Sequence, residues 1–403
     1  MMTSKRFVKH FLFFNFPLLF LIGGFNFYID AKSFHHNLGE KGFFPRTTED
    51  SVLSKLHYLS NNKLNTIYFG SSRTWVGLPP NPMLIGDKDI SVYNAGLSGM
   101  SFGQMVPFIK HCVALSQPRQ VIIGVDFFSF IPTDTVGNTD LDLSLLTSNY
   151  LTYLIKRNIS EFSKSISFYS IDSSIKSLNA FYNGVPYDGT QDNFSFQGQR
   201  TEAKMHSRIE DKGKGYEAFR MTINEVSKQG FAQSGNDESI YKFNNLVSLL
   251  CEKKISTKIY INPVHALLTD ILRQKGLWLR LEQWKAELAK IASFYQDKQC
   301  AINILDFSGY NSITTESLKN LSESKTLQYY WEASHYKSEV GELILKRFFS
   351  KDNSNIPQDF GRELRQDTVN NVLTAIRKEQ AQYLVSHNQD IQLAQKWVLA
   401  EKY

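Results

Sequence analysis

The amino-acid sequence predicts an α/β protein with a parallel sheet, an inserted subdomain and an N-terminal transmembrane helix. Three observations lead to this prediction. Short apolar runs rich in β-branched and aromatic residues occur at 66–69, 90–93 and 121–123, and each leads into a turn sequence. Helical patterns alternate with these runs, as they do in sheets of parallel strands. A charge-free apolar stretch precedes all of them.

The N-terminal segment has the features of a membrane anchor. Lys5, Arg6 and Lys9 are followed by residues 11–29, which carry no charge and are dense in Phe, Leu and Ile. This length is sufficient to span a bilayer. Because the basic flank lies on the N-terminal side, we expect a signal-anchor with the N-terminus in the cytoplasm and the main domain periplasmic or otherwise extracytoplasmic. A cleaved signal peptide is the alternative, although residues 25–34 lack a small-residue cleavage site.

The rest of the chain divides into a core and additions. Residues 1–30 form the cytoplasmic start and anchor, 48–130 and 236–350 the two halves of the core, 131–235 an inserted subdomain or lid, and 359–403 a helical tail. In the second half we expect helices at 239–251, at two places within 266–295 and at 338–349, and strands at 257–261 and 301–305. An apolar stripe in the tail has helical spacing and should pack on the domain or on a partner: Val369, Val372, Leu373 and Ile376.

Composition excludes several classes of function. The formal charge of +6 is modest and its Lys and Arg residues are scattered, so nucleic acid is not an expected partner. No glycine loop of the kind that cradles phosphates is present, no Cys/His spacing suggests zinc, and we expect no cofactor and no metal. Cys112, Cys251 and Cys300 do not make a disulfide framework. Cys251 and Cys300 either pair in an oxidising compartment or remain free thiols.

Four short segments together predict a hydrolase-type site. Three of them follow the first three apolar runs and so belong at the carboxyl ends of strands, where open α/β sheets bind ligands. The fourth lies just before the helix expected at 338–349. The segments are Phe69-Gly70-Ser71-Ser72-Arg73, Asn94-Ala95-Gly96-Leu97-Ser98-Gly99, Ile123-Gly124-Val125-Asp126 and Glu332-Ala333-Ser334-His335.

This ordered set resembles the SGNH hydrolase superfamily, in particular its membrane-anchored bacterial branch, which includes the alginate O-acetylation proteins and the D-alanine transfer protein of teichoic acids. The resemblance covers residues 60–130 and 250–350 and implies a flavodoxin-like three-layer fold. It implies that Ser72 is the nucleophile, that His335 and Glu332 complete the triad, and that Gly99 and the residue at the third-block position complete the oxyanion hole. In that family an Asn holds the third-block position, which is Asp126 here, and an Asp precedes the histidine, where this chain has Glu332.

The chemistry explains why these residue types are needed. An imidazole takes the proton of the serine hydroxyl, and a carboxylate orients the imidazole and stabilises its charged form. A Glu serves in other triads, so Glu332 keeps this chemistry. Asp126 is the larger departure, because a free carboxylate would repel the oxyanion, and losing one donor costs about 3 to 4 kcal/mol. Since Arg73 lies beside the nucleophile, we expect Arg73 to pair with Asp126. That pair would leave the oxyanion hole to the backbone N–H groups of Ser72 and Gly99.

Each candidate residue also has a structural interpretation. Ser72 fits a helix cap, His335 a satisfied histidine, Glu332 a solvated charge and Gly99 a turn with positive φ. His265 ends a strand on the same edge and is interpreted first as structural, with substrate contact as the alternative. Aromatic residues near the site suit stacking on sugars, although most should be core packing. They are Trp75, Phe102, Tyr329, Tyr330 and Trp331.

Two functions remain in competition. The first is an SGNH-type O-acyltransferase or esterase that modifies an envelope or exported polysaccharide, or another acylated envelope glycan, through a Ser-His-Glu triad. By its resemblance to the alginate system, a transferase of this kind would need a polytopic membrane-bound acyltransferase as partner. The second is a catalytically inactive SGNH-like protein that binds glycans or serves as a scaffold in an envelope or secretion complex. The distance from Ser72 Oγ to His335 discriminates between them.

Overall fold

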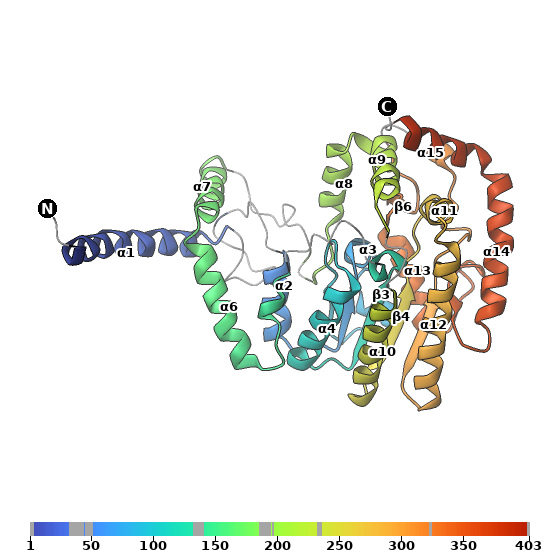
Figure 1. Ribbon diagram of the computed structural model, residues 1–403, viewed down its shortest axis with the longest axis horizontal. Helices are drawn as coiled ribbons and strands as arrows, with labels where there is room; N and C mark the ends of the chain where they lie inside the picture. The colour runs from blue at the N-terminus through green and yellow to red at the C-terminus, as the bar shows by residue number, and fades with distance from the viewer. Residues whose placement is uncertain are drawn as a thin grey trace.

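A computed structural model of the chain describes residues 4–31, 44, 51–131, 141–184, 195, 197–231, 236–321 and 325–400. The protein is a mixed α/β structure with a mostly parallel central sheet and helices on both faces (Figure 1). An apolar helix, α1 (Ser4–Ile29), projects from one end of the molecule and is long and apolar enough to cross a membrane. These features confirm the predicted α/β class, the parallel sheet and the apolar N-terminal helix.

Within the described residues the central sheet has the strand order β2-β1-β3-β4-β5-β8. The first five of these strands are parallel, and β8 pairs antiparallel with β5 at the edge. Each expected strand agrees with one of β1 to β5, whereas β8 is short and polar and gives no sequence signal. The strands are β1 (Thr66–Phe69), β2 (Val92–Asn94), β3 (Gln120–Val125), β4 (Ser256–Ile261), β5 (Ile302–Asp306) and β8 (Arg362–Glu363).

Alternate side chains of the strands enter two separate cores, as the two-residue period of a strand requires. In β3, Val121 and Ile123 face the first core and Ile122 faces the second. The first core is closed by α2 (Ser51–Asn61), α4 (Phe102–Ser116), α10 (Asn236–Glu252) and α12 (Trp278–Asp297). The second is closed mainly by α9 (Lys214–Lys228), α11 (Ala266–Gln274) and α13 (Ser338–Phe349).

The predicted insert at 131–235 contains two helical pairs that lie in different places. Helices α6 (Tyr150–Ser165) and α7 (Phe168–Tyr182) contact α1. Helices α8 (Glu202–Asp211) and α9 contact each other and the short antiparallel hairpin formed by β6 (Tyr330–Glu332) and β7 (His335–Tyr336) (Figure 1). Residues 132–140, 185–194, 196 and 232–235 of the insert lie outside the described part. Its boundaries therefore stay a prediction.

Short elements complete the connections. They are α3 (Ser72–Gly77), α5 (Phe127–Phe130) and the 3-10 helices η1 (Pro82–Ile85), η2 (Leu143–Leu145) and η3 (Leu318–Asn320). The tail forms α14 (Val369–Ser386) and α15 (Asn388–Ala400), with Val369, Leu373 and Ile376 buried against the domain and Val372 partly buried. Arg377 of α14 pairs with Glu282 of α12 at 2.7 Å. The tail thus packs on the domain, as its stripe predicts.

The cysteines adopt one of the two arrangements that the sequence left open. Cys251, near the end of α10, and Cys300, just before β5, form a disulfide with a Cα–Cα distance of 5.4 Å. Cys112 is a buried free thiol within the described structure. The disulfide thus links α10, which precedes β4 in the chain, to the start of β5, which pairs with β4 in the sheet.

The contact between α3 and α13 leads to a prediction about stability. A Cβ atom on Gly341 of α13 would lie 1.9 Å from the carbonyl oxygen of Gly77 in α3, and backbone cannot move aside cheaply. Gly341→Ala should therefore lower the free energy of unfolding by about 2 to 3 kcal/mol. Chemical denaturation of the full chain measures this loss.

The matched control is Gly103→Ala in α4, where the nearest atom to an added Cβ is 3.6 Å away. This change should be neutral or raise stability by about 0.5 to 1 kcal/mol, because alanine is the better helix former. Equal effects of the two substitutions would show that the α3–α13 contact is not tight.

Candidate active site

The first three predicted segments meet at one edge of the sheet. Strand β1 lies between β2 and β3, so the residues that follow these strands converge at their carboxyl ends. Ser72 follows β1, Gly99 follows β2 and Asp126 comes directly after β3. Gly99 has a φ of 63°, a conformation that favours glycine. All three residues line the same pocket.

Ser72 is the first residue of α3, and Ser71 is the N-cap of that helix. The Ser71 hydroxyl oxygen accepts the backbone N–H of Arg73 at 3.4 Å. The turn before it requires a glycine, because a Cβ on Gly70 would lie 1.9 Å from Thr74 Oγ1. The cap and the tight turn together fix the direction in which the Ser72 side chain leaves the helix.

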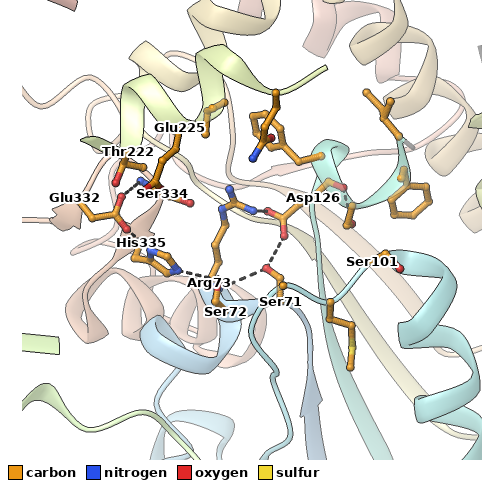
Figure 2. Close-up of a pocket in the computed structure, with 18 of the residues that line it drawn as sticks. Ser71, Ser72, Arg73, Ser101, Asp126, Thr222, Glu225, Glu332, Ser334 and His335 are labelled. Atoms are coloured by element: carbon orange, nitrogen blue, oxygen red, sulfur yellow. Dashed lines mark hydrogen bonds and ion pairs between the residues drawn. The ribbon is translucent and has the colours of Figure 1, made fainter. Parts of the chain in front are cut away.

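The fourth segment forms the β6–β7 hairpin, in which Glu332 is the cross-strand partner of His335. His335 Nδ1 is hydrogen-bonded to Glu332 Oε1, and His335 Nε2 lies 2.8 Å from Ser72 Oγ. The second carboxylate oxygen of Glu332 accepts the backbone N–H of Ser334 at 2.7 Å. The structure therefore brings Ser72, His335 and Glu332 into one hydrogen-bonded series (Figure 2).

Burial and pairing set the protonation states of this series. Burial acts to raise the pKa of Glu332, but the facing His335 and the Ser334 N–H outweigh it and bring that pKa to about 2. Burial lowers the pKa of His335 more than the Glu332 carboxylate raises it. At neutral pH the carboxylate is therefore ionised and the imidazole is neutral. Its Nδ1–H then donates to Glu332, and its Nε2 is free to accept the Ser72 proton.

Asp126 is buried and fully engaged. Its Oδ2 accepts the Ser71 hydroxyl at 2.7 Å, and its Oδ1 lies 3.2 Å from Nη1 of Arg73. The Arg73 side chain rises between Asp126 and the triad in Figure 2. The expected Arg73–Asp126 pair is thus present, and Ser71 is an additional partner. A carboxylate held by a cation and a hydroxyl carries less uncompensated charge toward the nucleophile.

A cavity of about 580 Å³ opens over these residues. Its floor comes from the strand ends, and part of its wall comes from Phe128 and Phe130 of α5. The opposite wall comes from α8 and α9, which supply Arg208, Thr222 and Glu225 (Figure 2). Arg208 acts electrostatically on both Glu332 and His335. The size is that of a site for a small organic group.

Two predicted contact residues lie outside this cavity. Trp75 is 3% exposed, and its ring lies between the Lys55 amine and the Arg200 guanidinium, 4.9 Å and 4.7 Å from the ring centre. His265 is 1% exposed and caps α11, with Nε2 donating to Glu316 O at 2.8 Å and Nδ1 accepting the Leu267 N–H. Neither lines the pocket, so the structural interpretation replaces substrate contact for both.

Three of the other aromatic residues named as candidates for stacking on sugars are not available for it. Phe102, Tyr330 and Trp331 are buried in packing positions. The rings that line the cavity, Phe128 and Phe130, follow the third segment and were not among the candidates. Ser71 was also missed, although two serines at the start of a helix are a usual capping signal. No sequence pattern pointed to Arg208 or Thr222 as pocket residues, because only the folding of the insert brings them to the site.

No group of three or more His, Cys, Asp or Glu residues suited to a metal occurs in the part of the chain that the structure describes. No protein-family model matches the chain, and no curated protein is detectably similar to it in sequence. The geometry of the Ser72 series is therefore the main guide to its chemistry.

The Arg73–Asp126 pair should be energetically coupled. Arg73→Met leaves a buried carboxylate with only Ser71 as partner, so it should cost about 3 to 5 kcal/mol of unfolding free energy. The double variant Arg73→Met/Asp126→Asn removes that charge and should be more stable than the single variant. Urea denaturation of the full chain measures the unfolding free energy of the wild type, of Arg73→Met, of Asp126→Asn and of the double variant.

The control for this cycle is the exposed pair of Lys176 and Asp172. Lys176→Met should change stability by about 1 kcal/mol or less, because solvent screens such pairs. Additive effects of Arg73→Met and Asp126→Asn would show that the two side chains do not depend on each other.

The reactivity of Ser72 should follow the protonation of His335. Because the pKa of His335 is lowered from 6.5, the neutral base persists at pH 6.5 and is lost only as the pH falls further. The rate at which a fluorophosphonate labels Ser72 should therefore be constant from pH 8 to pH 7 and decline at a midpoint below 6.5. A midpoint above 7 would mean that Glu332 governs the imidazole more strongly than burial does.

Proposed function

We propose that this protein is a membrane-anchored, extracytoplasmic SGNH-type O-acyltransferase or esterase that acts on an envelope or exported polysaccharide. The observation that supports this most strongly is the 2.8 Å separation of Ser72 Oγ and His335 Nε2, with Glu332 on the other imidazole nitrogen. That is the arrangement of an activated serine nucleophile. The strand order β2-β1-β3-β4-β5 also agrees with the flavodoxin-like sheet that the SGNH resemblance implies.

In the proposed reaction Ser72 Oγ attacks the carbonyl carbon of an acyl ester while His335 Nε2 takes its proton. The tetrahedral intermediate collapses, the ester C–O bond breaks, and His335 returns the proton to the leaving oxygen. The acyl group is then attached to Ser72. A sugar hydroxyl or water then attacks this second ester while His335 takes its proton. The bond between Ser72 Oγ and the acyl carbon breaks, His335 returns the proton to Ser72 Oγ, and the acyl group leaves on the acceptor.

The developing oxyanion needs donors close to Ser72. The N–H of Ser72 is in the first turn of α3, where helical N–H groups have no intrahelical acceptor. Gly99 lines the same cavity on the adjacent loop. We assign the oxyanion hole to these two backbone N–H groups. The Asp126 carboxylate is not a hydrogen-bond donor to the oxyanion, and its bonds to Ser71 and Arg73 compensate its negative charge.

The cellular placement rests on two features. Helix α1 is suited to span a membrane, with Lys5, Arg6 and Lys9 on the side expected in the cytoplasm. The Cys251–Cys300 disulfide is typical of an oxidising compartment outside the cytoplasm. Because a single helix cannot carry an activated acyl group across the membrane, transfer would need a polytopic membrane-bound acyltransferase partner. Hydrolysis would need none.

A second candidate is a glycan-binding or scaffold protein that keeps this shape without catalysis. Asp126 favours it, because that position lacks the amide donor of the SGNH pattern. The Ser72–His335 distance opposes it, because the distance is within hydrogen-bond reach without any movement.

A serine-directed fluorophosphonate probe tests the proposal on the full chain in detergent. We expect the wild-type protein to be labelled and Ser72→Ala to lose the label completely. The control is Ser386→Ala on α14, which removes an exposed hydroxyl outside the pocket and leaves the Ser72 series and its supporting contacts intact. A folded wild-type protein that does not react, or labelling that persists in Ser72→Ala, would reject the enzyme in favour of the binder.

A further inference from the structure

Helix α6 has an apolar stripe with no protein against it in the described structure. Four large side chains at helical spacing are largely exposed: Leu151 at 69%, Ile155 at 63%, Ile159 at 65% and Phe162 at 59%. Positions separated by three or four residues lie on one face of a helix, so these four form a continuous line. Soluble surfaces rarely expose such a line without a partner.

The opposite face of α6 contacts the α/β domain. Tyr150 OH donates to Asn61 Oδ1 of α2 at 2.9 Å, and Arg157 Nη1 lies 2.7 Å from His57 Nδ1 of the same helix. Tyr153 is fully buried beside His111 of α4. The apolar stripe therefore points away from the domain.

The end of α6 is attached to the end of α1. Asn26 Nδ2 donates to the backbone oxygen of Ser165, the last residue of α6, at 2.5 Å, and Asn26 lies in the last turn of α1. Figure 1 shows α6 running obliquely away from the C-terminal end of α1, with α1 on one side of α6 and α2 on the other. Tyr28, also in this turn, is 69% exposed, and such tyrosines are enriched where membrane helices meet the interface.

These observations combine into a position relative to a bilayer. If α1 spans the membrane, its last turn lies at the outer interface, and α6 begins its contact with α1 at that depth. The stripe from Leu151 to Phe162 extends over about 16 Å at the rise of an α-helix and faces away from the domain. A helix with one apolar face that is fixed at one end to the interfacial end of a membrane span is placed where monotopic helices lie.

We propose that α6 lies in the outer leaflet as an interfacial helix, with Leu151, Ile155, Ile159 and Phe162 among the lipid chains. This inference rests on the membrane placement of α1 given above and is independent of the Ser72 chemistry. The occupant of the stripe is lipid rather than a second copy of the chain, because the end of α6 is bonded to the last turn of α1 and the stripe therefore lies next to the span. Helix α6 is also hydrogen-bonded to α2, which leads into β1. The contact of α6 with the bilayer would therefore fix the height and orientation of the Ser72 pocket above the membrane.

Site-directed spin labelling of the full chain, reconstituted at one copy per lipid nanodisc, tests this. Single cysteines replace Leu151, Ile155, Ile159 or Phe162, and the unsubstituted chain reports background labelling. Collision with oxygen, which concentrates in lipid, is compared with collision with a water-soluble nickel chelate. Val385→Cys on α14, where the native side chain is 81% exposed, is the aqueous control, and Leu18→Cys within α1 is the lipid control.

We expect the ratio of oxygen to nickel collisions at the stripe to be several-fold above that at Val385 and close to that at Leu18. A ratio equal to that at Val385, with Leu18 in lipid, overturns the interfacial helix and leaves the anchor intact. If Leu18 also matches Val385, the membrane anchor of the proposed function fails together with this inference. Stripe labels shielded from both reagents, or labels that show spin–spin broadening when discs carry two copies, would assign the stripe to a second chain instead.

Discussion

The candidate site depends on the buried carboxylate of Asp126. Through Ser71 and Arg73 it ties the end of β3 to the first turn of α3, and Ser72 lies between these two partners in the sequence. Both ends of this connection are rigid, because β1 and β3 are paired in parallel register just before it. A buried charge of this kind is costly unless it is paired. The charge that departs from the SGNH pattern at Asp126 is thus also what holds Ser72 in place, through its two sequence neighbours.

The fourth segment shows how a longer acid is accommodated opposite the histidine. Glu332 faces His335 across a hairpin, and its second oxygen is held by the Ser334 N–H in the turn. The carboxylate is therefore fixed at both oxygens by groups within four consecutive residues. The additional methylene relative to an aspartate is taken up inside the hairpin, because both hydrogen bonds of the carboxylate are made there. This local closure explains why a Glu here is compatible with the geometry of a triad.

Much of the core was predictable because its signals are local. Strand β1 was located at both ends, since a short buried run of Thr, Ile, Tyr and Phe bounded by polar residues and glycine has few other interpretations. Ser72, Asp126 and His335 were singled out by the SGNH resemblance, which depends on motifs at strand ends and on their order, and the structure brings all three to one pocket. Arg208 and Thr222 were not, because only the tertiary packing of α8 and α9 brings them to the cavity. Trp75 was placed at the site by proximity in sequence, but the turn of α3 directs it into the core.

His265 and the tail show that residues outside the pocket still position it. The His265 N–H donates to Ala333 O at 3.1 Å, between Glu332 and His335, and its ring packs edge-on against Phe219 of α9 and Tyr330 of β6. Burial lowers the pKa of His265 to about 4, so it packs as a neutral ring.

On the far side of α9, Trp397 of α15 donates to Tyr216 OH at 2.9 Å and lies near Phe219, while Asp390 accepts the N–H of Leu318. Thr222 and Glu225, on the same helix as Tyr216, line the cavity. One wall of the pocket is therefore held between the β6–β7 hairpin and the C-terminal helix α15. The tail supplies no side chain to the Ser72–His335–Glu332 series, but it supports the helix that forms this wall of the cavity.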